Sequence, residues 1–370
     1  MNFSLTEEQE AVRDLAAQIF DGSVDPERVG AVEATDDRFD RDLWSTLADA
    51  NLLGIGLPEA VGGAGLGLTE VALVLEAQGR VVAPVPYWAT QAAALPIAAF
   101  GTPEQERAWL PGVVDGTVVL TAALAEPGVN DPLRPQTTAT PDGAGWRLDG
   151  LRPSVPAATV AAAALVPAVT PDGPAVFVVD LADAGVSLVR AVTTNREVHA
   201  HVTLSGARAE RLGDGRVPGE RILRGTVDRA LLGLCALQLG VCEAAIAQAA
   251  AYTSQRVQFG RPLSAFQGAQ LRAADTYIDT EAIRVTTWQA AWRLDSGHEA
   301  TSEVLVAKWW AAQAGQRVVH HVQHLHGGMG ADIGYPVHRY LLWGKQIEDT
   351  LGGSSVTLQR LGRRLAEARP

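Results

Sequence analysis

The chain has 370 residues, of which 47% are hydrophobic and 19% are charged, and its formal net charge is -12. This length predicts two or three packed units, and the composition is that of a globular protein rather than a disordered one. An acidic chain without a run of Lys and Arg argues against nucleic acid as a partner, because phosphate binding needs clustered cations. An anionic ligand would therefore be held by a few well-placed cations or by helix N-termini.

The hydrophobic residues predict neither a membrane span nor an export signal. No stretch reaches ~18 uninterrupted apolar residues, and the first ten residues are acidic and are expected to begin a helix. Cys235 and Cys242 stand seven residues apart on one predicted helix, too far along its axis for a disulfide. We interpret them as small buried residues of a protein in the reducing cytoplasm.

The first block, residues 1–117, has helical periodicity. Ser4 with Glu7, and Thr6 with Gln9, are overlapping candidates for a capping box, and apolar residues follow them at helical spacing. Four further helices are expected at 41–51, 69–78, 89–100 and 104–110.

Short β-branched stretches replace the helical pattern from about residue 118. They lie at 118–121, 175–179, 186–188 and 198–204. Asp142–Gly143, Asp149–Gly150 and Asp172–Gly173 are turn dipeptides between them. We predict a small all-β domain over residues 118–222.

Helical periodicity returns at residue 223. Two long Ala- and Leu-rich helices are expected at 225–255 and 263–295, joined by a turn around Phe259–Gly260, and a third at 301–324. Helices of this length packed side by side form an antiparallel bundle. Trp292 and its neighbour one turn earlier are candidates for core or subunit interface. The chain is therefore predicted to be mostly α, with domains over 1–117, 118–222 and 223–370.

Three motifs follow one another along the chain. Residues 125–128 are Ala-Glu-Pro-Gly; residues 256–262 are Arg-Val-Gln-Phe-Gly-Arg-Pro, followed by Phe-Gln at 266–267; residues 326–330 are His-Gly-Gly-Met-Gly, followed by Tyr-Pro at 335–336. Each alone is weak, but together, in this order and spacing, they resemble the acyl-CoA dehydrogenase family. The resemblance covers nearly the whole chain. It implies an N-terminal helical domain, a small β-barrel domain and a C-terminal four-helix bundle.

The family shares each FAD between two subunits, with the flavin ring on the β domain of one subunit and the ADP half on the C-terminal bundle of its neighbour. The resemblance implies the following ADP-side residues in this chain: Arg256, Phe259, Gln267, His324, Gly327 and Gly328. An arginine can pair with a pyrophosphate in bidentate fashion, and glycines let the backbone approach a phosphate closely. The alternative for Arg256 is a surface cation that ends a helix.

The positions of the family's catalytic base hold no acid in this chain. Family catalysis removes the α-proton of an acyl thioester with a Glu carboxylate while the β-hydride passes to the flavin. The two familiar places for that Glu fall on Leu351 and Ala230. Glu348, three residues before Leu351, is the best fallback base, although a solvated surface Glu is the simpler interpretation. Asp228 would face away from a site that Ala230 faces.

The flavin-ring side also departs from the family pattern. Ala125 replaces the hydroxyl residue before Glu-Pro-Gly, and Ser154–Val155–Pro156 replaces Trp-Ile-Thr. An aromatic wall is therefore missing, and Pro156 has no backbone N–H to donate. The ring half of the site is predicted to be lost while the ADP half is kept.

A heteromer accounts for this combination, with a homologous partner subunit supplying the catalytic Glu and the ring site. Residues 326–340 most resemble the non-catalytic subunits of actinobacterial α2β2 dehydrogenases of steroid side-chain degradation, for which cholesterol is the familiar source. This resemblance implies an acyl-CoA substrate, such as a steroid side-chain thioester, and electron-transfer flavoprotein as acceptor. Two alternatives stay open: a self-sufficient homomeric enzyme that uses Glu348, and a structural relative that binds neither flavin nor acyl-CoA.

Four histidines, His320, His321, His324 and His326, lie close together in the sequence. His320 and His324 have the spacing of two metal ligands on one helical face. No Cys or Asp supplies a third ligand nearby, so we predict packing or hydrogen bonding to a cofactor rather than a metal site.

Overall fold

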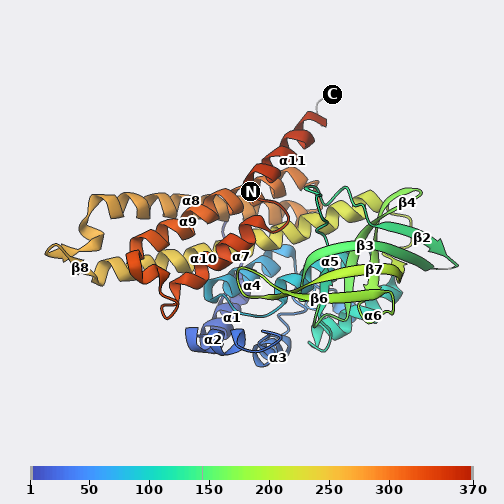
Figure 1. Ribbon diagram of the computed structural model, residues 1–370, viewed down its shortest axis with the longest axis horizontal. Coiled ribbons are helices and arrows are strands. Elements are labelled where there is room, and N and C mark those ends of the chain that lie inside the picture. Colours follow the sequence, from blue (N-terminus) through green and yellow to red (C-terminus); the bar gives the residue numbers. More distant parts are fainter. Residues whose placement is uncertain (1–2, 144, 368–370) are drawn as a thin grey trace. The chain divides into compact units, whose positions relative to one another are not determined.

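The computed structural model describes residues 3–143 and 145–367. Helices come first along the chain, strands occupy its middle and helices return after residue 219 (Figure 1). This order confirms the predicted fold class, mostly α with a middle β domain. The predicted domain boundaries at residues 117 and 222 stay a prediction.

The N-terminal helices begin with α1 (Glu7–Ser23), and its cap settles which capping-box candidate is used. The Thr6 hydroxyl oxygen accepts from the Gln9 backbone N–H at 3.2 Å, and the Gln9 side-chain oxygen accepts from the Thr6 N–H at 3.1 Å. The helices that follow are α2 (Pro26–Glu33), α3 (Arg41–Asp49), η1 (Glu59–Val61), α4 (Leu68–Val81), α5 (Tyr87–Phe100) and α6 (Pro103–Val114). Four of these match the expected helices to within four residues at each end, whereas α2 and η1 were not predicted.

The middle of the chain forms a closed β-barrel. Its strands are β1 (Leu120–Ala122), β2 (Thr138–Asp142), β3 (Gly145–Pro156), β4 (Ala163–Thr170), β5 (Gly173–Asp180), β6 (Val186–Val192) and β7 (Val198–Arg211). The pairings run β4–β2–β3–β7–β5 and return to β4, while β1 pairs with β4 and β6 pairs with β7. Leu148, Val166, Phe177 and Val202 are among the buried side chains that fill its core.

Two of the three predicted turns lie where they were expected. Gly143 lies between β2 and β3, Gly173 is the first residue of β5 after the turn from β4, and both have positive φ. The prediction for Asp149–Gly150 was wrong, because both residues lie inside β3 where its register with β7 shifts. Glycine is common in β-bulges as well as in turns, because both can need a positive φ or a close approach of the backbone to another group. At Gly150 a Cβ would come within 2.3 Å of the Thr137 hydroxyl.

The C-terminal helices form the predicted bundle. They are α7 (Gly219–Gln255), α8 (Gln267–Asp295), α9 (Thr301–His326), α10 (Val337–Asp349) and α11 (Ser354–Glu367). Helix α9 contacts α8, α10 and α11. It also approaches α7 closely, because a Cβ at Gly315 would come within 2.4 Å of the Gln238 side chain. Most apolar side chains of α9 are buried, as a central helix requires.

The chain divides into two compact units. We call them the bundle unit, which comprises Met1–Val29, Ala72–Ala83 and Leu234–Pro370, and the barrel unit, which comprises Gly30–Val71 and Pro84–Gly233. Within the described residues, α7 is the one helix long and apolar enough to cross a membrane, and 78% of its most apolar window is buried. The core helix of a soluble protein has the same composition, so this is weak evidence for a membrane span.

A half-buried ionic network links three helices of the bundle unit. Arg284 of α8 contacts Glu243 of α7, Glu281 of its own helix at 3.1 Å and Glu76 of α4 at 3.6 Å. Burial and the neighbouring Glu243 carboxylate raise the pKa of Glu76 to about 8. Glu76 is therefore held largely protonated at neutral pH, which reduces the negative charge among the three acids that contact Arg284.

Candidate functional site

A pocket of about 680 Å³ lies in the bundle unit, where α7 ends and α8 begins. Between these helices the chain forms a hairpin of β8 (Val257–Gln258) and β9 (Arg261–Pro262) and then η2 (Leu263–Ala265). The end of α9 and the start of η3 (Gly327–Ala331) complete its wall. Five of the six predicted ADP-side residues line it: Arg256, Phe259, His324, Gly327 and Gly328. Gln267 is not in the wall, although both of its chain neighbours are.

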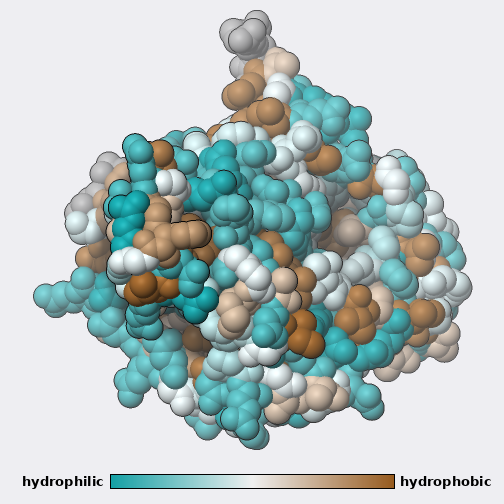
Figure 2. Space-filling view, turned by 60° about the vertical axis from the view of Figure 1, so that its left-hand side comes forward, coloured by the Kyte–Doolittle hydropathy of each residue, from teal (hydrophilic) through white to brown (hydrophobic). Residues whose placement is uncertain are grey.

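The hairpin holds an aromatic ring out into solvent. Phe259 and Gly260 occupy its two turn positions with φ of 52° and 80°, which is the left-handed region. A two-residue turn of this kind favours Asn-Gly, and a phenylalanine there costs roughly 1–2 kcal/mol. The Phe259 side chain is 91% exposed and meets the Phe266 ring edge-on at 6.3 Å. Backbone strain at a residue whose ring stays almost fully exposed indicates a function for that ring. Hydrophobic residues are visible at the surface of this end of the protein in Figure 2.

The two glycines leave open space in front of the backbone. Gly327 ends α9 with φ of 59° and ψ of −137°, a conformation that few other residues adopt. An ideal Cβ placed on Gly327 or Gly328 would meet no described atom within 4 Å. A ligand can therefore approach this backbone closely, and a side chain at either position would stand in its way.

Sequence reasoning missed part of the wall. Arg272, half-buried on the second turn of α8, adds a second cation to the pocket. Tyr252 of α7 stacks on the His326 ring at 4.6 Å, and Tyr335 lies 5.5 Å from the same ring. Burial lowers the pKa of His326, so its imidazole is neutral at physiological pH. Arg272 lies beyond the Phe-Gln motif at 266–267, so no motif points to it.

The two positions of the family base are occupied by apolar side chains. Ala230 is fully buried in the barrel unit, and its carbonyl oxygen accepts a hydrogen bond of 2.9 Å from the Trp88 indole. Leu351, half-buried after α10, has a φ of 58°. Asp228 is buried on the third turn of α7, which begins at Gly219. Neither base position offers a carboxylate.

Glu348, the fallback base, is already engaged. It lies on the last turn of α10, and its carboxylate forms an ion pair with Lys345, one turn earlier on the same helix. Lys308 of α9 is fully buried and donates to the carbonyl oxygens of Ile347 at 2.8 Å and Glu348 at 3.0 Å. Burial lowers the pKa of Lys308 to about 8. This lysine fixes the end of α10, so the Glu348 backbone has little freedom to move the carboxylate into another site.

In the barrel unit, the Glu of the Ala-Glu-Pro-Gly motif has a structural task. The Glu126 carboxylate is buried and accepts hydrogen bonds from the backbone N–H groups of Gln136 at 2.6 Å and Thr137 at 2.8 Å. Arg152 of β3 lies 2.7 Å from it, and the exposed fractions of the two side chains are 1% and 4%. The preceding Ala125 is exposed and has no hydroxyl to offer.

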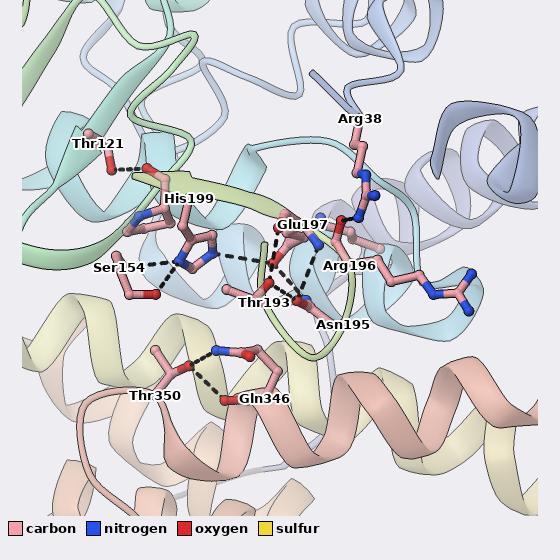
Figure 3. Close-up of polar contacts among 12 residues, drawn as sticks. Arg38, Thr121, Ser154, Thr193, Asn195, Arg196, Glu197, His199, Gln346 and Thr350 are labelled. Carbon is pink, nitrogen blue, oxygen red and sulfur yellow. Dashed lines mark hydrogen bonds and ion pairs between the residues drawn. The ribbon is translucent and has the colours of Figure 1, made fainter. Parts of the chain in front are cut away.

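The segment that replaces Trp-Ile-Thr is held by histidines of β7 (Figure 3). The Ser154 hydroxyl lies 3.0 Å from Nδ1 of His199, and the Ser154 carbonyl oxygen lies 2.9 Å from the same nitrogen. A carbonyl only accepts, so Nδ1 carries the proton and cannot activate the serine hydroxyl as a base. Glu197 lies 3.9 Å from Nε2 of His199. Thr121 donates to the Pro156 carbonyl at 2.6 Å. Figure 3 also draws Gln346 and Thr350 of the bundle unit, which bond to each other.

Metal ligands do not gather in the part of the chain that the structure describes: no group of three His, Cys, Asp or Glu side chains could hold an ion there. His320 is exposed and His326 is buried, although they lie less than two turns apart on α9.

Two family models match this chain. The model described as "Acyl-CoA dehydrogenase, N-terminal domain" matches residues 6–117, and the one described as "Acyl-CoA dehydrogenase, C-terminal domain" matches residues 219–366. Acyl-CoA dehydrogenase FadE27 of Mycobacterium tuberculosis is 39% identical over 376 residues, which cover 99% of each chain.

Solved structures agree with these matches. A chain of a Tcur3481–Tcur3483 steroid ACAD is 51% identical with a TM-score of 0.94, and the match covers 98% of each chain. A chain of the ChsE4–ChsE5 complex from Mycobacterium tuberculosis is 39% identical with a TM-score of 0.94, over 100% of each chain. FAD is the cofactor of this family. On this evidence the chain belongs to the acyl-CoA dehydrogenase family.

Proposed function

We propose that this chain is the non-catalytic subunit of a heteromeric, FAD-dependent acyl-CoA dehydrogenase. In this proposal it completes the FAD site of a homologous partner subunit that carries the catalytic Glu. One observation carries the proposal. Five of the six predicted ADP-side residues line one pocket, while Leu351 and Ala230 place apolar groups where the family has its base. A homomeric enzyme would need both halves.

The pocket suits the ADP half of FAD. Arg256 and Arg272 supply two guanidinium groups for a pyrophosphate, which they can bind through charge-assisted hydrogen bonds. Phe259 offers an exposed flat face on which a ring can stack. The open space before Gly327 and Gly328 lets a phosphate or sugar reach the backbone. FAD supplies hydride acceptance when it is bound, and the residues of this chain hold and orient its nucleotide end.

The barrel unit also supports the proposal that the partner subunit, and not this chain, binds the flavin ring. Ala125 offers no hydroxyl, and Pro156 offers no backbone donor. Ser154, which bonds to His199, has no aromatic ring to stack against a flavin as the family's Trp does.

The relatives suggest an assembly, a substrate and an electron acceptor for this chain. The Tcur3481–Tcur3483 protein is described as a steroid ACAD, and ChsE4–ChsE5 is described as a complex. By analogy we propose an α2β2 assembly in the cytoplasm, with a steroid side-chain CoA thioester as the substrate to be α,β-desaturated. Electron-transfer flavoprotein is the proposed electron acceptor, and a solved structure described as the electron transferring flavoprotein of Acidaminococcus fermentans contains a chain that is 28% identical to this one.

We expect Glu348→Gln to leave the activity of the assembled dehydrogenase within about twofold of wild type, because the Glu348 carboxylate is paired with Lys345 rather than facing a substrate. Steady-state acyl-CoA dehydrogenation with the co-expressed Glu-bearing partner measures this. Asp349→Asn, on the neighbouring exposed residue, is the matched control. A loss of about 100-fold or more in kcat for Glu348→Gln alone would contradict the proposal and favour a self-sufficient enzyme.

A further inference from the structure

His326, on the last turn of α9, is the buried histidine of the pocket wall. It is 2% exposed, whereas His324, which also lines the pocket, is exposed. The His326 ring stacks on the Tyr252 ring with the centroids 4.6 Å apart, and the centroid of the Tyr335 ring lies 5.5 Å away. Two aromatic neighbours therefore hold this imidazole in place at the pocket.

A hydrogen bond to Nδ1 fixes the tautomer of His326. Nδ1 lies 2.9 Å from the carbonyl oxygen of Val322, four residues earlier on α9. A carbonyl oxygen only accepts, so Nδ1 carries the proton. Burial lowers the pKa of the imidazole, so the ring holds no second proton at physiological pH. Nε2 is therefore a hydrogen-bond acceptor.

Nε2 of His326 is buried and meets no hydrogen-bond donor among the residues that the structure describes. Buried polar side-chain atoms nearly always have a partner, because an acceptor that is removed from water and left alone costs free energy. Burial by itself does not identify that partner. The position of the ring does, since His326 belongs to the wall of the pocket and a molecule bound there can supply the donor.

We infer that Nε2 of His326 accepts a hydrogen bond from the exocyclic amine of the adenine in FAD, and that His326 thereby selects an adenine nucleotide for this pocket. The inference rests on the proposed function, because it assigns a contact within the ADP-side half of the site. The ADP half of FAD offers few donors. Its pyrophosphate is ionised at neutral pH and only accepts, so the donor is either the adenine amine or a ribose hydroxyl.

The residues around His326 favour the amine. Tyr252 and Tyr335 surround the imidazole with flat rings, and a purine packs against such rings better than a ribose does. Gly327, the next residue, leaves its backbone open, so the sugar attached to the base can lie there. Arg256 and Arg272 are then left for the pyrophosphate, as in the proposed function.

His338 provides a matched control for a role in packing alone. Its Nδ1 lies 2.7 Å from the Tyr335 carbonyl oxygen, and its Nε2 is likewise buried without a partner in the described part of the chain. His338 does not line the pocket, however. Replacing either histidine by leucine removes one buried imidazole, but only the His326 variant changes the pocket wall.

Titration of the apo form of the assembled dehydrogenase with two cofactors, followed by flavin fluorescence, tests the contact. Flavin hypoxanthine dinucleotide carries a carbonyl oxygen where the adenine of FAD carries its amine. We expect the wild-type complex to bind this analogue roughly 10- to 100-fold more weakly than FAD, because Nε2 would face a second acceptor. His326→Leu is expected to bind the two cofactors with Kd values within about threefold of each other. His338→Leu is expected to keep the wild-type ratio.

The ratio of the two Kd values separates the outcomes. Equal Kd values in the wild type would mean that water pairs with Nε2, and this result would overturn the inference without the use of any variant. A wild-type ratio in His326→Leu, or a ratio lost equally in His338→Leu, would also overturn it, because the contact would not belong to His326. Close to one FAD per chain without any partner would instead contradict the proposed function, whatever the ratio.

Discussion

Arg256→Gln is expected to weaken FAD binding by the assembled dehydrogenase by roughly 10- to 100-fold. The substitution removes one charge-assisted contact to a pyrophosphate, which is worth ~1.5–3 kcal/mol, and each ~1.4 kcal/mol is a factor of ten in Kd. Arg272 keeps one guanidinium in the pocket, so binding is reduced rather than abolished. Titration of the apo complex with FAD, followed by flavin fluorescence, measures the change.

Arg261→Gln is the matched control for that titration. Arg261 belongs to the same hairpin and lies 4.1 Å above the Phe266 ring, but it does not line the pocket. We expect its Kd for FAD to stay within about threefold of wild type, as for a surface charge screened by salt. Equal losses for the two arginines would show that the hairpin fold, not the Arg256 contact, determines affinity.

Arg152→Met is expected to lower the free energy of unfolding by ~3–5 kcal/mol, because it leaves the buried Glu126 carboxylate without its cation. Burial lowers the pKa of Arg152 to about 10, although the adjacent Glu126 acts against this shift, so the guanidinium is still charged at neutral pH. Arg152 also donates to the Pro167 carbonyl, which loses that bond in the variant. Urea denaturation at pH 7 gives the free energy directly.

Two further variants distinguish the stability lost with the buried Glu126–Arg152 pair from the stability lost when any arginine is removed. Arg107→Met removes a cation whose partner, Glu104, is itself exposed, so the loss of stability should be much smaller than that of Arg152→Met. Arg152→Met with Glu126→Gln should recover part of the stability, because the double variant buries no lone charge. If the Arg152→Met variant were as stable as Arg107→Met, the Glu126–Arg152 pair would contribute little to the free energy of unfolding.

Local rules predicted the fold well where one segment decides its own structure. The Thr6–Gln9 capping box and the Gly143 turn depend on residues within a few positions of each other, and the sequence displays them. The Asp149–Gly150 prediction failed because the choice between a turn and a bulge is made by the partner strand β7, some 55 residues later. The closure of the barrel through β4 and β2 likewise depends on non-local pairing.

The candidate site shows the same difference between features set by residues close in sequence and features set by distant ones. The motifs located Arg256, Phe259 and the two glycines through resemblance, and the structure brings them to one pocket. Resemblance could not find Arg272, because it lies outside every motif, nor the Ser154–His199 contact, because it joins two strands.

The FAD content of the purified chain, measured by visible absorption alone and again after co-expression with its Glu-bearing partner, tests the central claim most directly. The proposed half-site predicts colourless protein for the chain alone and about one FAD for each pair of chains in the complex. Yellow protein with close to one FAD per chain in the absence of any partner would contradict it. That result would mean that Ala125, Ser154 and Pro156 still support a flavin ring.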